Sequence, residues 1–277
     1  MAITATDLDG TLLLNDTTVS KENLEAIKRL SQKGIETVVV TGRGLYEIPQ
    51  ELLDFDSIEY FIFSNGAGIY KRGSGVVFHS EINRETAKRV VELLGNYEVF
   101  IELYINGTPT VDKNKFSEEA FDYYSIDRDF YPELIRSRKP VDNFEALLGG
   151  SLDGLEMFDL FFKNQEERAA CAEAFNKYFP ELEYTTSMTN NLEAMNFGIN
   201  KGSGLRRLCE AENIDINDIY ALGDSKNDLA MFEAVENCFA VSNACDELKR
   251  ISKGVICSNQ EHIMCYMERL YKEQGIA

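Results

Sequence analysis

The stretch Ile3-Thr4-Ala5-Thr6-Asp7-Leu8-Asp9-Gly10-Thr11 joins a short β-rich run to a turn that carries two carboxylates. Apolar residues at helical spacing follow over 20–33, and a second β-rich run occupies 35–40. A strand, a helix and a strand in this order predict a parallel pair of strands with a right-handed crossover. Because side chains alternate along a strand, we expect Asp7 and Asp9 on the same side, at the carboxyl end where open α/β sheets hold their ligands.

The same alternation of strands and helices covers both ends of the chain. A third buried run lies at 60–63, and helices and strands alternate again from 202 to 272. Between them, strand-like and helical segments over 82–187 are rich in aromatic residues. We therefore predict an α/β fold in which a doubly wound, parallel, Rossmann-like core sheet, built from 1–81 and 188–277, carries an inserted α/β domain at 82–187.

The chain is strongly acidic, which limits its partners. Its 277 residues include 28 Lys and Arg against 47 Asp and Glu, for a formal net charge of −19. This charge disfavours binding to nucleic acid and to anionic membrane surfaces, whereas a small phosphorylated metabolite can bind where a metal ion supplies local positive charge. No apolar run is long enough to cross a bilayer, and residues 1–7 lack the features of a signal peptide. We expect a cytoplasmic protein that is a monomer or a weak homo-oligomer.

A second acidic segment, Gly223-Asp224-Ser225-Lys226-Asn227-Asp228, also follows a predicted strand and opens a helix. Asp224 and Asp228 are four residues apart and can converge on one side of the turn. Taken alone, either acidic segment is explained as well by a solvated turn or by helix capping. Together, at the ends of two parallel strands, they predict a Mg²⁺ site, because Mg²⁺ prefers hard oxygen ligands and accepts a substrate phosphate.

Three smaller signals lie at the same predicted edge of the sheet. Thr41-Gly42-Arg43 follows the strand at 35–40 and offers a hydroxyl group, backbone N–H groups and a guanidinium group. Lys201 opens the helix at 202, where a helix N-terminus already favours an anion. Asn65-Gly66-Ala67-Gly68 is equally compatible with a hairpin turn and with a ligand contact. Considered alone, the first segment is explained by an ordinary turn and Lys201 by an ordinary surface position.

The order of these motifs resembles that of the haloacid dehalogenase-like (HAD) superfamily, and within it the Cof-type sugar phosphatases with a large inserted α/β cap. The resemblance covers both core segments, and it implies that the domain at 82–187 is a cap that determines substrate specificity. At the C-terminal end, the usual Asn-(x)n-Gly-Val ending is replaced by Ser258-Asn259-Gln260-Glu261-His262. The matching segments are Asp7-Leu8-Asp9-Gly10-Thr11, Val40-Thr41-Gly42-Arg43, Ser64-Asn65-Gly66-Ala67, Lys201-Gly202 and Gly223-Asp224-Ser225-Lys226-Asn227-Asp228.

The resemblance implies a Mg²⁺-dependent phosphatase that acts on a small phosphomonoester such as a sugar phosphate. Asp7 is expected to attack phosphorus and form an aspartyl-phosphate, with Asp9 as general acid and base. Thr41 and Lys201 are expected to bind the phosphoryl oxygens. The other implied residues are the Mg²⁺ ligands Asp7, Asp9 (through its backbone carbonyl), Asp224 and Asp228, and the substrate-binding residues Gly42, Arg43, Asn65 and Asn227.

Two other functions would use the same residues. A phosphomutase would pass the phosphoryl group to a second sugar hydroxyl rather than to water. A catalytically silent regulator would bind a phosphorylated metabolite without turning it over. Such a regulator would be free to lose Asp9, which this chain retains.

Overall fold

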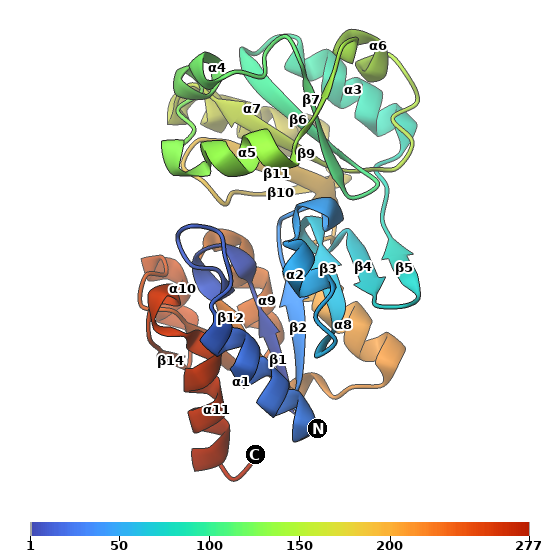
Figure 1. Ribbon diagram of the computed structural model, residues 1–277. Helices are drawn as coiled ribbons and strands as arrows, with labels where there is room; N and C mark the ends of the chain where they lie inside the picture. The colour runs from blue at the N-terminus through green and yellow to red at the C-terminus, as the bar shows by residue number, and fades with distance from the viewer. Residues whose placement is uncertain (1, 277) are drawn as a thin grey trace. The chain divides into compact units, whose positions relative to one another are not determined.

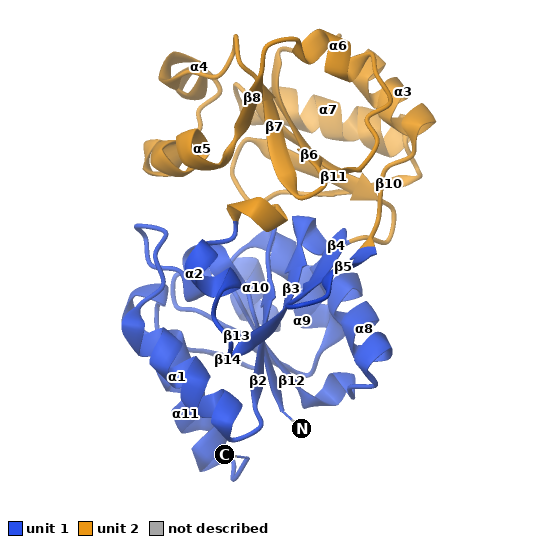
Figure 2. Cartoon of the chain, turned by 45° about the vertical axis from the view of Figure 1, so that its right-hand side comes forward, with its two compact units in different colours: residues 1–43, 48–78, 200–277 blue, residues 44–47, 79–199 orange. Residues whose placement is uncertain are grey.

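The computed structural model describes residues 2–276, which form two compact units (Figure 2). The chain returns from the second unit to the first at 199/200, whereas the predicted boundary was 187/188. The difference arises because the strand at Asn191–Asn196 joins the sheet of the second unit. The ends of the predicted division, Met1 and Ala277, lie outside the described residues. Within the described residues, unit 1 contains 2–43, Ile48–Phe78 and 200–276, and unit 2 contains Gly44–Glu47 and His79–Ile199.

Unit 1 is built on a sheet with the strand order β14-β13-β12-β1-β2-β3-β4-β5 (Figure 1). All neighbours from β14 to β3 pair in parallel, as predicted for a doubly wound sheet, whereas β4 pairs antiparallel with β3. The strands are β1 (Ile3–Thr6), β2 (Glu36–Val40), β3 (Ile58–Phe63), β4 (Gly68–Lys71), β5 (Gly75–His79), β12 (Ile219–Gly223), β13 (Asn237–Ala240) and β14 (Gly254–Val255).

Helices cover this sheet, with α1 packed against α11 on one side and α8 packed against α9 on the other (Figure 2). The segment 45–53 is α-helical only at its end, because Pro49 has no N–H to donate and disfavours helical backbone at the residue before it. The helices are α1 (Lys21–Gln32), α2 (Gln50–Leu53), α8 (Lys201–Glu212), α9 (Leu229–Ala234), α10 (Asp246–Ile251) and α11 (Ile263–Glu273).

The chain order reverses at β1, which lies between β12 and β2. In an open α/β sheet such a switch point leaves a crevice at the carboxyl ends of the strands, where ligands bind. The strands on both sides are buried over most of their length, so their sequences are nearly continuous in apolar residues. The structure therefore places residue 7 at the centre of the sheet edge.

Unit 2 contains a separate sheet with the strand order β10-β11-β9-β6-β7-β8. The pairs from β10 to β7 are antiparallel, and β7 pairs in parallel with β8. The strands are β6 (Val99–Ile105), β7 (Thr108–Asp112), β8 (Lys139–Val141), β9 (Leu155–Phe162), β10 (Leu182–Thr185) and β11 (Asn191–Asn196). The helices are α3 (Arg84–Leu94), α4 (Glu118–Tyr123), α5 (Tyr131–Ser137), α6 (Phe144–Leu148) and α7 (Gln165–Tyr178).

The two faces of this second sheet differ in chemistry. One face packs against α3 and α7 in an apolar core that includes Leu103, Phe158 and Leu192. The next residues along each strand point to the opposite face, where Phe100 and Phe161 pack under α4 and α5. The same opposite face also carries the buried acids Glu102, Asp159 and Glu193, with Met157 and Met195 beside them. Among the described residues, no helix is long and apolar enough to pass through a bilayer.

Candidate active site

The turn after β1 holds two carboxylates in different surroundings. The backbone N–H of Asp7 donates to the carbonyl of Leu222 at 3.0 Å, so the turn starts between the two central strands. Asp7 is 4% exposed, whereas the side chain of Asp9 is 39% exposed. Gly10 has a φ of +71°, and a Cβ there would lie 2.5 Å from Oδ2 of Asp224. Only glycine therefore fits between the two acidic turns.

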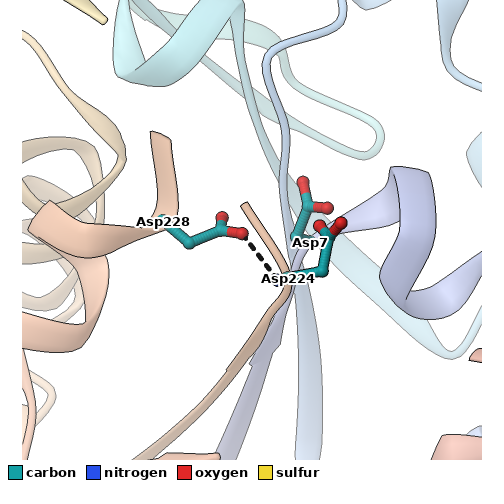
Figure 3. Close-up of side chains that lie close together, drawn as sticks. All are labelled: Asp7, Asp224 and Asp228. Atoms are coloured by element: carbon teal, nitrogen blue, oxygen red, sulfur yellow. Dashed lines mark hydrogen bonds between the residues drawn. The ribbon is translucent and has the colours of Figure 1, made fainter. Parts of the chain in front are cut away.

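The carboxylates of both acidic segments meet at this edge of the sheet. Asp7, Asp224 and Asp228 each offer an oxygen, and these atoms lie within 4.8 Å of one another (Figure 3). The three side chains come from the ends of two neighbouring parallel strands, β1 and β12. The structure thus brings together residues that are more than two hundred positions apart in the sequence and that the motifs assigned to one site.

Asp228 also holds the second acidic loop in place. Its Oδ2 accepts the backbone N–H groups of Asp224 at 2.9 Å and Ser225 at 3.1 Å. Its Oδ1 accepts a hydrogen bond from Nζ of Lys201 at 2.7 Å, and the residue is fully buried. The alternative explanation by helix capping therefore accounts for one oxygen of Asp228, while the other oxygen contacts the cation of the site.

Lys201 lies inside the cluster rather than on the surface. It is 1% exposed, and its Nζ donates to Oδ1 of Asp7 and to Oδ1 of Asp228, both at 2.7 Å. It is the first residue of α8, whose start is capped by the side chain of Asn200. A Cβ at Gly202 would lie 2.1 Å from the carbonyl oxygen of Ala230, so glycine allows α8 to approach α9 closely enough to bring the lysine to this position.

The cluster has an excess of negative charge. Burial is the main reason that the pKa of Asp7 rises to about 7; Asp228 and Asp9 add to the rise, and Lys201 opposes it. Burial, with Asp7 and Asp228 nearby, raises the pKa of Asp224 to about 9. Burial disfavours the ammonium group of Lys201, yet Asp228 and Asp7 raise its pKa above the ordinary value. The lysine thus stays charged among carboxylates that resist ionising together.

A divalent cation fits this set of residues. When ionised, Asp7, Asp224 and Asp228 carry three negative charges against the single positive charge of Lys201, which leaves two negative charges. All the available donors are carboxylate oxygens, the hard ligands that Mg²⁺ prefers. A divalent ion would both balance the excess and lower the pKa values that burial raises.

Asp9 is paired with Arg43. The guanidinium group binds the carboxylate in bidentate fashion, with Nε 2.7 Å from Oδ2 and an Nη atom 2.7 Å from Oδ1. Arg43 is 7% exposed, so the cation is held in place while its partner remains accessible. The sequence analysis expected Arg43 to bind substrate, and the structure instead places its guanidinium group on the expected general acid. Binding of a substrate by Arg43 stays a prediction.

Four other predicted residues line the same region. The hydroxyl of Thr41, which is fully buried, accepts the backbone N–H of Arg43 at 3.1 Å. Nδ2 of Asn227 donates to Oδ1 of Asn65 at 3.2 Å, and its Oδ1 accepts from Lys201 at 3.3 Å. A Cβ at Gly42 would lie 3.2 Å from Asn65 and 3.3 Å from Asn227, so glycine keeps this surface open. Asn65 therefore both begins the β3–β4 hairpin and contacts the cluster.

Two contacts at the site were not singled out in the sequence. The hydroxyl of Thr11 donates to Oδ1 of Asp224 at 3.4 Å, and its place in the first motif was the available signal. Nδ2 of Asn243 donates to the carbonyl of Gly10 at 2.8 Å. Asn243 follows β13, and a lone asparagine in a loop gives no sequence signal for such a contact.

Comparison with known proteins identifies the family. The sequence pattern of the haloacid dehalogenase-like hydrolases matches residues 4–264. The chain belongs to this family. The resemblance inferred from the motifs is therefore confirmed, and the two units correspond to the core and cap domains of an HAD-like hydrolase.

Similar HAD-like proteins span nearly the whole chain. The 5-amino-6-(5-phospho-D-ribitylamino)uracil phosphatase YwtE of Bacillus subtilis is 29% identical over 96% of this chain and 96% of its own length. Phosphatase YwpJ of the same organism is 28% identical over 96% of this chain and 98% of its own length. A solved HAD-like hydrolase from B. subtilis superposes with a TM-score of 0.84, at 25% identity, over 97% of this chain and 99% of its own.

The likeness extends to a sugar phosphatase of HAD subclass IIB, with a TM-score of 0.82 and full coverage of both chains. Its sequence identity is 21%, so this likeness concerns the fold alone. The predicted α/β class, with a core sheet and an inserted cap, is thereby confirmed.

Proposed function

We propose that this HAD-like hydrolase is a Mg²⁺-dependent phosphatase that hydrolyses a small phosphomonoester through an aspartyl-phosphate on Asp7. The observation that carries the proposal is the convergence of Asp7, Asp224 and Asp228, two of which, Asp7 and Asp228, contact the buried ammonium group of Lys201. Such a cluster can accept a phosphate ester only together with a cation, because its own charge repels the substrate. The names of YwtE and YwpJ as phosphatases support the same reaction.

The first half-reaction uses Asp7 and Asp9. A carboxylate oxygen of Asp7 attacks phosphorus, and the bond between phosphorus and the ester oxygen breaks. Asp9 gives its proton to the departing alkoxide, which leaves as an alcohol. The exposure of Asp9 suits this role, because a general acid must reach the leaving group, whereas Asp7 is held in one orientation by Lys201.

The second half-reaction regenerates the enzyme. Asp9, now ionised, takes a proton from a water molecule, whose oxygen attacks phosphorus and breaks the bond to Asp7. Inorganic phosphate leaves, and Asp7 is again a carboxylate. Lys201 and Thr41 bind phosphoryl oxygens and balance the charge that develops on them. Arg43 acts as a positioning residue, because its bidentate contact fixes the orientation of the Asp9 carboxylate.

Mg²⁺, when bound, supplies charge neutralisation between the carboxylates and the anionic ester. Asp7, Asp224 and Asp228 would hold it through side-chain oxygens, and Asp9 through its backbone carbonyl. Gly42, Asn65 and Asn227 form the adjoining surface that would contact the phosphate.

The cap is proposed to select the leaving group. The relative YwtE is named for a substrate that combines a phosphorylated ribityl chain with an aminouracil ring. We place that compound and ordinary sugar phosphates among the candidate substrates of this chain. In a family whose core chemistry is shared, the choice between such compounds falls to the inserted domain.

A phosphate-release assay tests the proposal. Purified protein with Mg²⁺ is offered p-nitrophenyl phosphate, sugar phosphates and the ribitylaminouracil phosphate, without any acceptor sugar. We expect phosphate release, which falls by at least about 10⁴-fold in Asp7→Asn because the nucleophile is lost. Glu210→Gln, an equal change of charge at an exposed position on α8, is the matched control and should retain full activity.

Three results would contradict the proposal. Unchanged turnover in Asp7→Asn would remove the aspartate from its assigned role. Turnover that requires an acceptor sugar would favour a phosphomutase. Tight binding of a phosphate ester by wild-type protein without any turnover would favour the silent regulator.

A further inference from the structure

The turn after β1 depends on a residue with little conformational preference of its own. Gly10 directly follows Asp9, and its φ of +71° and the proximity of Asp224 restrict this position to glycine. A glycine backbone has more conformational freedom than that of any other residue. Asp9 must keep one position to act as a general acid, so the turn at Gly10 requires support from elsewhere in the fold.

The side chain of Asn243 provides this support. Its Nδ2 donates to the carbonyl oxygen of Gly10 at 2.8 Å. Its Oδ1 accepts the backbone N–H of Asn259 at 3.1 Å, which fixes the direction of the amide group. Asn243 therefore connects the backbone of the catalytic turn to the backbone of the loop at 258–262.

Two further asparagines hold the end of the same turn. Nδ2 of Asn259 donates to the carbonyl of Leu13 at 2.9 Å, and Nδ2 of Asn23 donates to that of Leu12 at 3.4 Å. Both asparagines are buried. Oδ1 of Asn23 accepts the backbone N–H of Met264 at 3.0 Å, so its amide group is also held in one direction. The C-terminal part of the chain thus contributes to three contacts with the turn, and all of these residues lie within unit 1.

The loop Ser258–His262, to which the motifs gave no role, is itself held in place. The backbone N–H of Ser258 donates to Oε2 of Glu261 at 2.9 Å. Nδ1 of His262 lies 2.9 Å from Oγ of Ser20, the N-cap residue of α1. These contacts do not involve the acidic cluster. The loop can therefore support the turn whether or not a substrate is bound.

The nucleophile does not depend on this support. The backbone N–H of Asp7 donates to the carbonyl of Leu222 on β12, and its side chain accepts from Lys201 on α8. Asp9 lies beyond the end of β1, and its carboxylate is held by Arg43. Loss of support for the turn should therefore displace Asp9 and leave Asp7 in place.

We propose that Asn243 is a positioning residue for the general acid, which keeps Asp9 where it can protonate the leaving group. The inference rests on the proposed phosphatase function and adds a residue to its mechanism. Arg43 fixes the carboxylate end of Asp9, and Asn243 fixes the backbone next to it through Gly10. A side chain keeps one position only when both of its ends are held.

Three esters of similar shape test this role: p-nitrophenyl phosphate, phenyl phosphate and benzyl phosphate. Their leaving groups need a proton to an increasing extent, because nitrophenolate leaves as a stable anion whereas the benzyl alkoxide must be protonated. The measured quantity is kcat/KM, which covers the reaction up to the release of the alcohol. The later role of Asp9 as a base therefore does not enter the comparison.

The expected effect of Asn243→Ala depends on the leaving group. We expect kcat/KM for benzyl phosphate to fall at least about tenfold, because a general acid contributes about 10²–10⁴-fold and a displaced one keeps only part of this. For p-nitrophenyl phosphate we expect a fall of less than about threefold, because its leaving group hardly needs the acid. Asp9→Asn, which removes the acid itself, should show the same order of effects at larger size.

The matched control is Asn237→Ala. Nδ2 of Asn237 also donates to a backbone carbonyl, that of Asn217 at 3.2 Å, but Asn237 begins β13 whereas Asn243 follows the end of this strand. This variant should leave kcat/KM unchanged for all three esters. Melting temperatures of both variants show how much stability each hydrogen bond contributes.

Two results would overturn the inference. If Asn243→Ala lowered kcat/KM for the three esters by the same factor, its role would be merely structural. If it left all three values unchanged, the contact with Gly10 would not position Asp9 at all.

Failure of the inference differs from failure of the proposed function. If wild-type protein hydrolyses the esters and Asn243→Ala preserves their ratios, the inference is wrong and the phosphatase function stands. Wild-type protein that hydrolyses only p-nitrophenyl phosphate would lack a working general acid, which also contradicts the inference alone. If wild-type protein with Mg²⁺ hydrolyses none of these esters, both are wrong.

Discussion

The core domain and the cap each bury a group of acids against a single cation, and the two groups are built differently. In the core, Asp7 and Asp224 project from loops at the ends of parallel strands, and loops can converge on one point. In the cap, Glu102 and Asp159 stand on the strands themselves, so the pairing register fixes their separation. Convergent acids suit one small ion, whereas acids in a row stay apart by the spacing of the strands. The backbone that carries a charge thus decides what that charge can bind.

The largest expected effect breaks the core group. Lys201→Met leaves Asp7 and Asp228 without the ammonium group that contacts both. We expect kcat to fall by at least about 10³-fold, because a charge-stabilising contact is lost. The free energy of unfolding without metal should fall by about 3–5 kcal/mol, because two buried carboxylates lose their partner. Denaturant unfolding and phosphate release measure the two effects.

The control for this variant is Lys28→Met, which removes the same charge from an exposed position on α1. It should change stability by less than about 0.5 kcal/mol. If Lys201→Met were as stable as this control, the ammonium group would not be balancing the buried carboxylates.

The next effect comes from the ion-pair network of the cap, in which Arg138 binds Glu47 and Glu102. Arg138→Met leaves Glu47 and Glu102 buried without their guanidinium partner. We expect the free energy of unfolding to fall by about 3–5 kcal/mol. Arg138→Lys should fall between this variant and the wild type, because a lysine keeps the charge and loses the bidentate geometry. Equal stability of all three proteins would show that the network contributes little to folding.

Addition of Mg²⁺ should stabilise the protein through the acids of the core and not through the buried acids of the cap. An ion that binds only the folded protein stabilises it by about 2.7 kcal/mol at a concentration one hundred times its Kd. We expect such a rise in thermal stability for wild-type protein and for Asp159→Asn, and its loss in Asp224→Asn. Thermal unfolding with EDTA and with Mg²⁺ is the measurement. A Mg²⁺ effect that survives in Asp224→Asn would contradict the assignment of the metal to the core.

The smallest expected effect concerns the buried acid Glu156, whose partner His79 can lose its charge. Nε2 of His79 lies 2.6 Å from Oε1 of Glu156, and Nδ1 lies 3.1 Å from Oε1 of Glu81. The hydrogen bond to Glu156 is the main reason that the pKa of His79 is raised in the folded protein. A raised folded-state pKa stabilises the protein below the unfolded value of 6.5, and this stabilisation is lost as pH rises through the folded-state value.

Wild-type protein should therefore be more stable than His79→Gln at about pH 5.5, and this advantage should shrink towards about pH 9. We expect a difference of about 2–4 °C in melting temperature between the two ends of this range, as about 1 kcal/mol produces in a domain of 150–250 residues. Melting curves of both proteins across the range measure it. An advantage that grows with pH would have the wrong sign for this ion pair.

The convergence of Asp7, Asp224 and Asp228 could be expected from the sequence because its signals are local. Asp7 and Asp224 each follow a strand directly, and parallel strands that end at one edge bring such residues together. The pairing of Arg43 with Asp9 could not be predicted, because it depends on how two turns from different strands approach each other. The sequence could not decide whether Asn65 forms a hairpin turn or contacts a ligand, since the same residues favour both.

The cap was harder to predict for a related reason. The sequence predicted strand-like and helical segments over 82–187, where the structure has the strands β6 and β9 among others. The alignment of Glu102 with Asp159 depends on the register between strands separated by most of the domain. A local pattern gives the face on which a residue lies, and does not give the residue across from it.

The insertion of the cap between β5 and α8 has a consequence for synthesis of the protein. β1 pairs with β2 on one side and with β12 on the other, and the partner of Ile3 on the second side is Ile219. A ribosome adding about 5–20 residues per second leaves that edge of β1 without its neighbour for about 10–40 s. The cap is almost one continuous segment, so its sheet can form during this interval. Exposed strand edges attract other chains, and the first segment of this protein is therefore most prone to aggregate before translation is complete.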